Sequence, residues 1–177
     1  MYHLSKNTCN VEQFIEFWST QYDYPNERLY KDNIDNELTE KSVFELFEWK
    51  NGLTLSGSKR QSIYDNYITE NDLISKDAST EAIKEYLNRP GGAVWRIFWL
   101  HCNYTAKFPI FDQHVYRAMA YLKEKEDLEI VSNNTKKVNS YVDEYLSFYT
   151  GFEYEDNKKL DEALWAFGKF LSHGYKI

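Results

Sequence analysis

The stretch that decides the fold runs from Arg89 to Lys123 and has the sequence RPGGAVWRIFWLHCNYTAKFPIFDQHVYRAMAYLK. A Pro-Gly-Gly turn opens it, and an apolar segment over residues 93–103 follows at once. This segment predicts a helix with almost no polar face, and such a helix belongs in the centre of a fold. After a short extended connector over 107–111, Asp112 begins another helix.

Helical periodicity also dominates the rest of the 177 residues, and strand-like alternation never persists. Asn10 and Ser79 are expected as helix N-caps. The polar segment 22–37 predicts a long loop, and 52–58 predicts a turn. The predicted helices cover residues 11–18, 40–50, 59–68, 70–74, 81–88, 93–103, 112–126, 133–150 and 156–173. We therefore expect an all-α helical array forming one domain over residues 1–177.

Cysteine usage and hydropathy restrict the class of protein. Cys9 and Cys102 have no CxxC spacing and no neighbouring histidine cluster, so neither a zinc site nor an iron–sulfur cluster is expected. The N-terminus lacks the order of a signal peptide, and no apolar run approaches the length that spans a bilayer. The sequence predicts a cytoplasmic protein with no membrane association, no metal and no organic cofactor.

Charge is distributed unevenly along the chain. The net charge of −7 disfavours a generic nucleic-acid binder, which neutralises phosphates with basic side chains. The stretch over residues 89–123 is nevertheless a basic island, in which DNA or another anionic partner is expected to dock. Its five bases against one acid, Asp112, are Arg89, Arg96, Lys107, Arg117 and Lys123. The aromatic content of 18% suits either an aromatic core or a surface that stacks bases.

The turn and Asp112 together suggest a chemistry. Adjacent glycines let the backbone approach a ligand closely, and the N–H groups at the start of the following helix favour a phosphate. A carboxylate at a helix N-terminus is kept ionised by the helix dipole. An ionised carboxylate beside an anion-binding turn suits cleavage of a glycosidic bond, in which the sugar becomes cationic.

These motifs resemble a known family. Pro90-Gly91-Gly92, followed about 20 residues later by Phe-Pro-Ile-Phe-Asp112-Gln-His114-Val-Tyr-Arg117, is similar to the core of the helix–hairpin–helix DNA glycosylase superfamily, of the endonuclease III and 3-methyladenine glycosylase type. The resemblance covers Leu87–Arg117 well and Asp156–Leu171, with Gly168, loosely. It implies a glycosylase-like core over about residues 80–177. The hairpin is one residue shorter than in the family, where the motif has Gly-x-Gly.

The resemblance also implies roles for single residues. Asp112 is the expected catalytic carboxylate of a monofunctional DNA N-glycosylase that excises a modified or mispaired base flipped out of the duplex. No lysine lies between Pro90 and Cys102, where the family's lyase nucleophile would stand, so Schiff-base chemistry is not expected. The expected DNA contacts are Gly91, Gly92, Arg96, Lys107 and Gln113, and the expected base pocket is formed by Trp95 and Trp99.

Other interpretations of the same residues remain open. Asp112 also suits an ordinary N-cap, His114 a structural hydrogen-bonding group, and Arg117 a partner for an acid on a neighbouring helix. Trp95 and Trp99 also suit a hydrophobic core. At the level of function, the alternatives are a glycosylase-fold binding or interaction module without catalysis, and an enzyme that acts on free nucleosides or nucleotides.

Overall fold

The structure is a computed structural model that describes residues 10–70, 73–130 and 132–174. These residues form helices and contain no strand, which confirms the predicted all-α fold class. They divide into two compact units that interleave along the chain. Unit 1 comprises Met1–Asp23, Asp112–Ile130 and Ser147–Ile177, and unit 2 comprises Tyr24–Phe111 and Val131–Leu146. The single domain over residues 1–177 stays a prediction.

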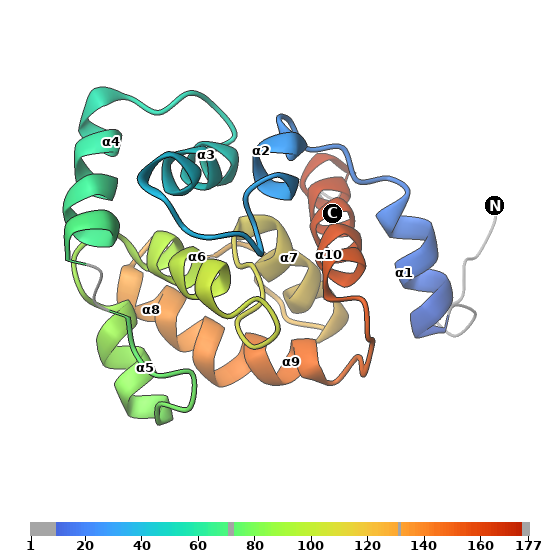
Figure 1. Cartoon of the computed structure of the whole chain (residues 1–177). Coiled ribbons are helices and arrows are strands. Elements are labelled where there is room, and N and C mark those ends of the chain that lie inside the picture. The colour runs from blue at the N-terminus through green and yellow to red at the C-terminus, as the bar shows by residue number, and fades with distance from the viewer. Residues whose placement is uncertain (1–9, 71–72, 131, 175–177) are drawn as a thin grey trace. The chain divides into compact units, whose positions relative to one another are not determined.

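Unit 1 is built on α10 (Asn157–Gly174), which packs against both α1 (Val11–Ser19) and α7 (Gln113–Leu122) (Figure 1). The short helix α9 (Leu146–Thr150) precedes α10 in the chain. Aromatic rings fill the space between the three longer helices. Phe167 of α10 lies with its ring centroid 5.3 Å from that of Phe14, 5.0 Å from Trp18 and 5.4 Å from Tyr121. One side chain of α10 therefore joins all three helices.

The crossing of α7 and α10 depends on one glycine. A Cβ atom placed on Gly168 would lie 1.9 Å from the backbone oxygen of His114. No side chain fits at that distance, so the two backbones meet closely at a position that requires glycine. This crossing holds the start of α7, where Asp112 lies, against α10.

Unit 2 surrounds the apolar helix α6 (Ala93–Asn103). Figure 1 shows α6 between α3 and α4 on one side and α5 and α8 on the other. Phe47 of α3 contacts Phe98 and Trp99 of α6, with ring centroids 5.5 and 6.3 Å apart. The predicted central position of this helix is confirmed within unit 2. The remaining helices are α2 (Glu27–Lys31), α3 (Glu40–Asn51), α4 (Gly57–Ile63) with its π-helical extension η1 (Tyr64–Thr69), α5 (Thr80–Leu87), and α8 (Asn134–Asn139) with its π-helical extension η2 (Ser140–Tyr145).

Most predicted helices are confirmed to within a few residues, and their caps explain where they begin. The Asn10 side chain accepts a hydrogen bond from Gln13 N at 2.8 Å, and the Gln13 side chain accepts one from Asn10 N at 3.2 Å. This reciprocal capping satisfies donors that the first turn of α1 leaves open. Ser79 caps α5 by accepting from Ala82 N.

Three predictions of secondary structure are wrong. The segment 22–37 contains helix α2, because Tyr30 and Ile34 are buried and anchor it in unit 2. In the segment 70–74, the described residues 70, 73 and 74 are not helical. The helix begun by Asp112 ends at Leu122, since Glu124 adopts a left-handed backbone with φ of 55°.

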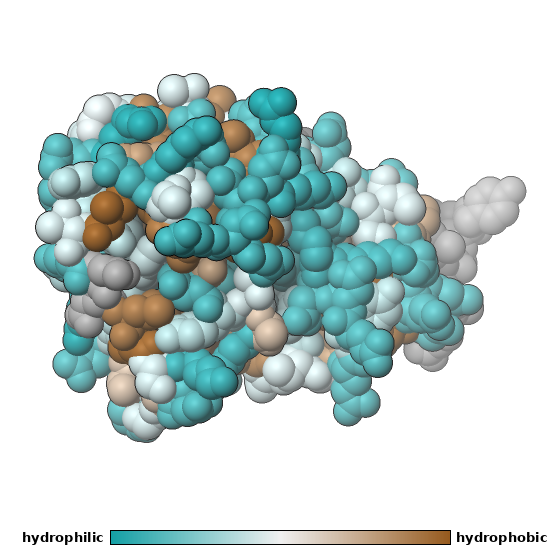
Figure 2. All heavy atoms as spheres, in the orientation of Figure 1, coloured by the Kyte–Doolittle hydropathy of each residue, from teal (hydrophilic) through white to brown (hydrophobic). Residues whose placement is uncertain are grey.

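On the face drawn in Figure 2, hydrophilic residues cover most of the visible area, and hydrophobic residues appear there in small separate areas. Among the described residues, no helix is both long enough and apolar enough to cross a membrane.

Candidate functional site

The Pro-Gly-Gly turn, residues 90–92, connects α5 to α6 and is called the hairpin below. Gly91 and Gly92 have φ of +107° and +86°, a region that side chains disfavour. A Cβ atom on Gly91 would also lie 2.6 Å from the Tyr67 hydroxyl oxygen. That hydroxyl donates a hydrogen bond of 2.9 Å to Gly91 O. Backbone conformation and close packing therefore both require the glycine at position 91.

Arg96 holds the hairpin from inside. Only 2% of its surface is exposed, and its Nε donates a 2.5 Å hydrogen bond to Pro90 O. Its guanidinium lies over the rings of Tyr86 and Tyr67, 5.1 and 5.5 Å from their centroids. Burial raises the pKa of Tyr67 well above its ordinary 10.0, although the charge of Arg96 lowers it in part. The expected phosphate contact of Arg96 is wrong, because its guanidinium is buried and bonds the turn instead.

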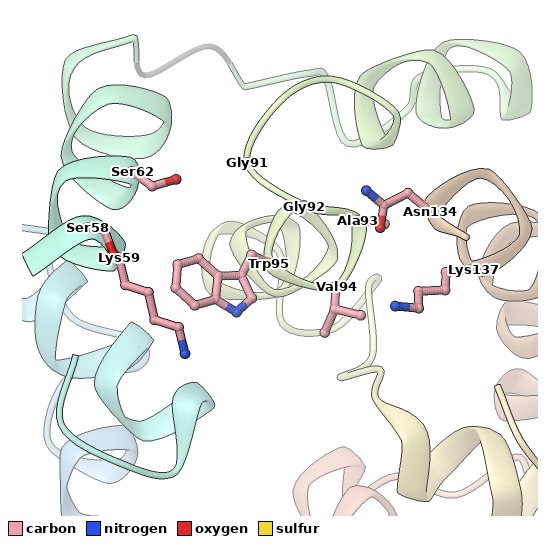
Figure 3. A pocket seen from close by; sticks show the side chains of 10 residues that line it. All are labelled: Ser58, Lys59, Ser62, Gly91, Gly92, Ala93, Val94, Trp95, Asn134 and Lys137. Atoms are coloured by element: carbon pink, nitrogen blue, oxygen red, sulfur yellow. The ribbon is translucent and has the colours of Figure 1, made fainter. Parts of the chain in front are cut away.

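A pocket of about 400 Å³ opens beside the hairpin, wholly within unit 2 (Figure 3). It gathers residues from α4, from the hairpin and the first turn of α6, and from α8. We call it the hairpin pocket. Its lining residues are Ser58, Lys59, Ser62, Gly91, Gly92, Ala93, Val94, Trp95, Asn134 and Lys137. Two of these are lysines and none is an acid, so the lining carries net positive charge.

The two lysines of the hairpin pocket come from opposite walls. In Figure 3, Lys59 extends from α4 and Lys137 from α8, with Trp95 and Val94 between them. The Lys59 ammonium donates to Asn51 Oδ1 at 2.5 Å and lies 5.9 Å from the centroid of the Trp95 ring. Neither lysine was predicted as a site residue from the sequence, because each is more than thirty residues from the hairpin and neither belongs to a motif.

The N-terminus of α6 also faces this pocket. Gly92 is the N-cap residue, and as a glycine it has no side chain that could cap the helix. Ala93 and Val94 of the first turn line the pocket. The first N–H groups of a helix have no partner within the helix and carry the positive end of its dipole. An anion in the hairpin pocket would therefore meet backbone donors as well as ammonium groups.

Asp112 lies in unit 1, at the start of α7. Its Oδ1 accepts hydrogen bonds from His114 N at 2.8 Å and Val115 N at 3.2 Å, which confirms the N-cap interpretation. The residue is half-buried. A catalytic role is compatible with this capping, since one carboxylate can cap a helix and remain partly accessible.

Arg117 and His114 contact other residues of unit 1 and hold its helices together. Arg117 is 5% exposed, and its Nη2 donates to both carboxylate oxygens of Glu129 at 2.9 Å. Its Nη1 donates to Gly168 O at 3.1 Å and lies 3.3 Å from His114 Nδ1. The His114 ring meets the ring of Trp165 edge to face at 5.1 Å. Arg117 therefore pairs with an acid as one interpretation predicted, but Glu129 lies in the loop after α7 and not on a neighbouring helix.

The remaining predicted site residues differ in exposure. Trp95 is half-buried and lines the hairpin pocket, whereas Trp99 is 3% exposed and packs on Tyr67 in the core of unit 2. Trp99 is therefore a core residue, and the prediction that it forms part of a base pocket is wrong. Lys107 is exposed, donates to Lys76 O and lies 3.6 Å from Asp77, which offsets its charge. Gln113 is exposed.

The described side chains of His, Cys, Asp and Glu include no group of three that could hold a metal ion. The described residues form a positively charged pocket in unit 2 and a helix-capping carboxylate in unit 1. A scan against protein-family models found no match to this chain, and searches of curated proteins and of solved structures found none either.

Proposed function

We propose that this protein binds DNA at the hairpin pocket and releases a modified or mispaired base by hydrolysing its N-glycosidic bond, with Asp112 as the catalytic carboxylate. One observation carries the proposal: two lysines, a tryptophan and the glycine hairpin face one pocket that has no acid in its lining. Such a pocket suits a phosphate with an adjacent base.

The local charge supports DNA as the ligand in spite of the overall charge. The chain has a net charge of −7, so its surface as a whole repels a polyanion. Lys59 and Lys137 reverse the sign at the hairpin, and the backbone donors there add further attraction for a phosphate. DNA is therefore expected to bind at this pocket in preference to the rest of the surface.

The position of Asp112 supports the catalytic part of the proposal. The Asp112 carboxylate accepts hydrogen bonds from two backbone N–H groups and lies at the positive end of the dipole of α7. An ionised carboxylate stabilises a cationic sugar or takes a proton from the attacking water. Water then adds its oxygen to the sugar carbon, and the base departs with a proton. The route is monofunctional, since it uses no lysine nucleophile.

The test is base release from duplexes that contain a panel of modified or mispaired bases, with wild-type protein and Asp112→Asn. Asparagine caps helices as well as aspartate does, so this variant keeps the start of α7 but loses the charge. We expect release to fall by about 100-fold or more, in the range found when a general acid or base is removed. Unchanged release by Asp112→Asn would contradict the catalytic role.

Asp156→Asn is the matched control. Asp156 is exposed and accepts a hydrogen bond from Lys159 N at 3.0 Å, so it caps the start of α10 much as Asp112 caps α7. The two substitutions remove the same charge from equivalent positions. Base release by Asp156→Asn should match that of the wild-type protein.

A binding module without catalysis is the second candidate. The hairpin pocket favours it in one respect, because its lining includes no carboxylate and binding there needs none. Salt-dependent DNA binding by the wild-type protein, with no base released from any duplex of the panel, would support this candidate. Hydrolysis of free nucleosides without DNA binding would instead support an enzyme of small substrates.

A further inference from the structure

Trp95 presents a ring face to the hairpin pocket. Its ring contacts Phe47 edge to face, with centroids 5.3 Å apart and an interplanar angle of 61°, so the core of unit 2 fixes its orientation. The ammonium group of Lys59 lies over the ring at 5.9 Å from the centroid. Since Lys59 also lines the pocket, the face beneath this flexible side chain is directed toward the pocket.

The lysines are arranged around this ring. Lys59 and Lys137 approach from opposite walls, with Trp95 and Val94 between them (Figure 3). In a nucleic-acid strand, each base is flanked by two phosphates, one on either side. The order of an ammonium group, an aromatic ring and a second ammonium group in the pocket therefore matches the order of a phosphate, a base and a second phosphate in the strand. The volume of about 400 Å³ falls in the range of pockets that hold small organic ligands.

From this arrangement we infer that the hairpin pocket receives one unpaired nucleotide, whose base stacks on Trp95 while its flanking phosphates meet Lys59 and Lys137. Inside a duplex, stacked neighbours cover both faces of each base, whereas the base of an unpaired nucleotide can turn out and stack on an aromatic side chain. The inference rests on the proposed function for the identity of the ligand as DNA. It is independent of Asp112 and of catalysis.

The first test measures equilibrium binding of a labelled oligothymidine strand and of its duplex with oligodeoxyadenosine. The wild-type protein should bind the single strand at least tenfold more tightly than the duplex. Trp95→Ala should weaken single-strand binding by about tenfold or more, because the base no longer has a ring to stack on. Equal affinity for the two forms, or full single-strand affinity in Trp95→Ala, would overturn the inference.

Trp95→Phe is the control for a folding defect in Trp95→Ala. Phenylalanine keeps a ring against Phe47 and a face toward the pocket, so its loss of affinity should be smaller than that of Trp95→Ala. Thermal unfolding of both variants is measured alongside binding. If both variants unfold as the wild-type protein does and bind the single strand equally well, stacking on Trp95 is excluded.

The second test uses the salt dependence of binding to detect the lysine–phosphate pairs. Removal of one such pair should reduce the slope of log affinity against log salt by about 0.7 for a single strand. Lys137→Ala should show this change, and Lys59→Ala should show it too. Lys136→Ala is the matched control, since Lys136 is the exposed neighbour of Lys137 on α8 and does not line the pocket. Equal slopes for Lys136→Ala and Lys137→Ala would overturn the role of Lys137.

Failure of this inference is distinguishable from failure of the proposed function. Asp112-dependent base release without a single-strand preference leaves the function standing and overturns the nucleotide pocket. Single-strand binding that depends on Trp95 and Lys137, without base release, supports the pocket and removes the catalysis. Wild-type protein that binds neither form of DNA overturns the inference directly.

Discussion

At the residue scale, Arg117 is a buried cation that connects three parts of unit 1. Its guanidinium donates to Glu129 in the loop after α7, donates to Gly168 O of α10, and lies beside His114 of α7. A guanidinium satisfies these acceptors together because its donors are fixed in a planar fork, which an ammonium group cannot reproduce. Arg117 therefore stabilises the position of α7, and with it the start of the helix at Asp112.

Arg117→Lys should lower the free energy of unfolding by about 1–3 kcal/mol, because it removes the donor from the buried Gly168 O and breaks the paired bonds to Glu129. Urea unfolding followed by circular dichroism measures the change. Glu129→Gln is the control: its side chain is 68% exposed and keeps an acceptor oxygen, so its effect should stay under about 1 kcal/mol. A lysine variant as stable as the wild-type protein would show that the fork geometry is unimportant.

Residue roles that depend on local sequence could be predicted, and those that depend on distant partners could not. The cap formed by Asp112 involves only the next few residues, so the sequence indicated it correctly. Arg96 and Arg117 were counted as charges of a basic island. Their burial follows from acceptors at Pro90 and Gly168, and no pattern in one sequence identifies such partners.

At the element scale, the crossing of α7 and α10 should tolerate no side chain at Gly168. An added Cβ would lie 1.9 Å from His114 O, which belongs to the backbone and cannot turn aside. Gly168→Ala should therefore destabilise the protein by about 3 kcal/mol or more, at the upper end for overpacking. Gly57→Ala is the matched control, since a Cβ there meets nothing within 4 Å and alanine favours the helix.

Urea unfolding of the two alanine variants tests this difference. Gly57→Ala should equal or exceed the stability of the wild-type protein, while Gly168→Ala should unfold at a clearly lower urea concentration. Equal midpoints for the two variants would mean that α7 and α10 can separate at little cost. The position of Asp112 would then depend on other contacts.

The helices themselves were predictable because their apolar spacing is local, but their irregular turns were not. Residues 133–150 were predicted as one helix, and the structure has two α-helices joined by the π-helix η2. Buried tyrosines at 141, 145 and 149 recur every four residues. On an α-helix each such step drifts by about 40° around the axis. A wider π turn reduces this drift, so the spacing is a signal that a search for α-helical periods overlooks.

At the scale of the whole molecule, the candidate site is assembled from segments that the sequence keeps apart. The hairpin was predicted from its own motif, and Trp95 was predicted with it. The charge was expected from the island over residues 89–123, whereas the structure supplies it to the pocket through Lys59 and Lys137. These side chains reach the hairpin because α8 packs against α6, and because residues of α4 line the same pocket as the first turn of α6. Tertiary packing is therefore the part of the site that sequence alone could not predict.

A buried thiol and a buried phenol are expected to make the protein less stable at alkaline pH. Burial raises the pKa of the Cys102 thiol above its ordinary 9.0 and that of the Tyr67 phenol above its ordinary 10.0. Above pH 9, both groups stay protonated in the folded state, whereas the same thiol and phenol lose their protons in the unfolded chain. Unfolding therefore becomes more favourable as pH rises. The stability that these groups contribute is complete below pH 9 and is lost progressively above it.

The free energy of unfolding should therefore fall by about 2–3 kcal/mol between pH 8 and pH 10.5, at about 1.4 kcal/mol per unit of pH for each fully titrating group. Urea unfolding at both pH values measures the fall. The double variant Tyr67→Phe/Cys102→Ala carries neither titrating group. It should be less stable than the wild-type protein at pH 8, because Tyr67 no longer bonds Gly91 O, yet it should lose less on going to pH 10.5. An equal loss in both proteins would assign the alkaline sensitivity to other groups, and Tyr67 would then hold the hairpin through its hydrogen bond without linking it to pH.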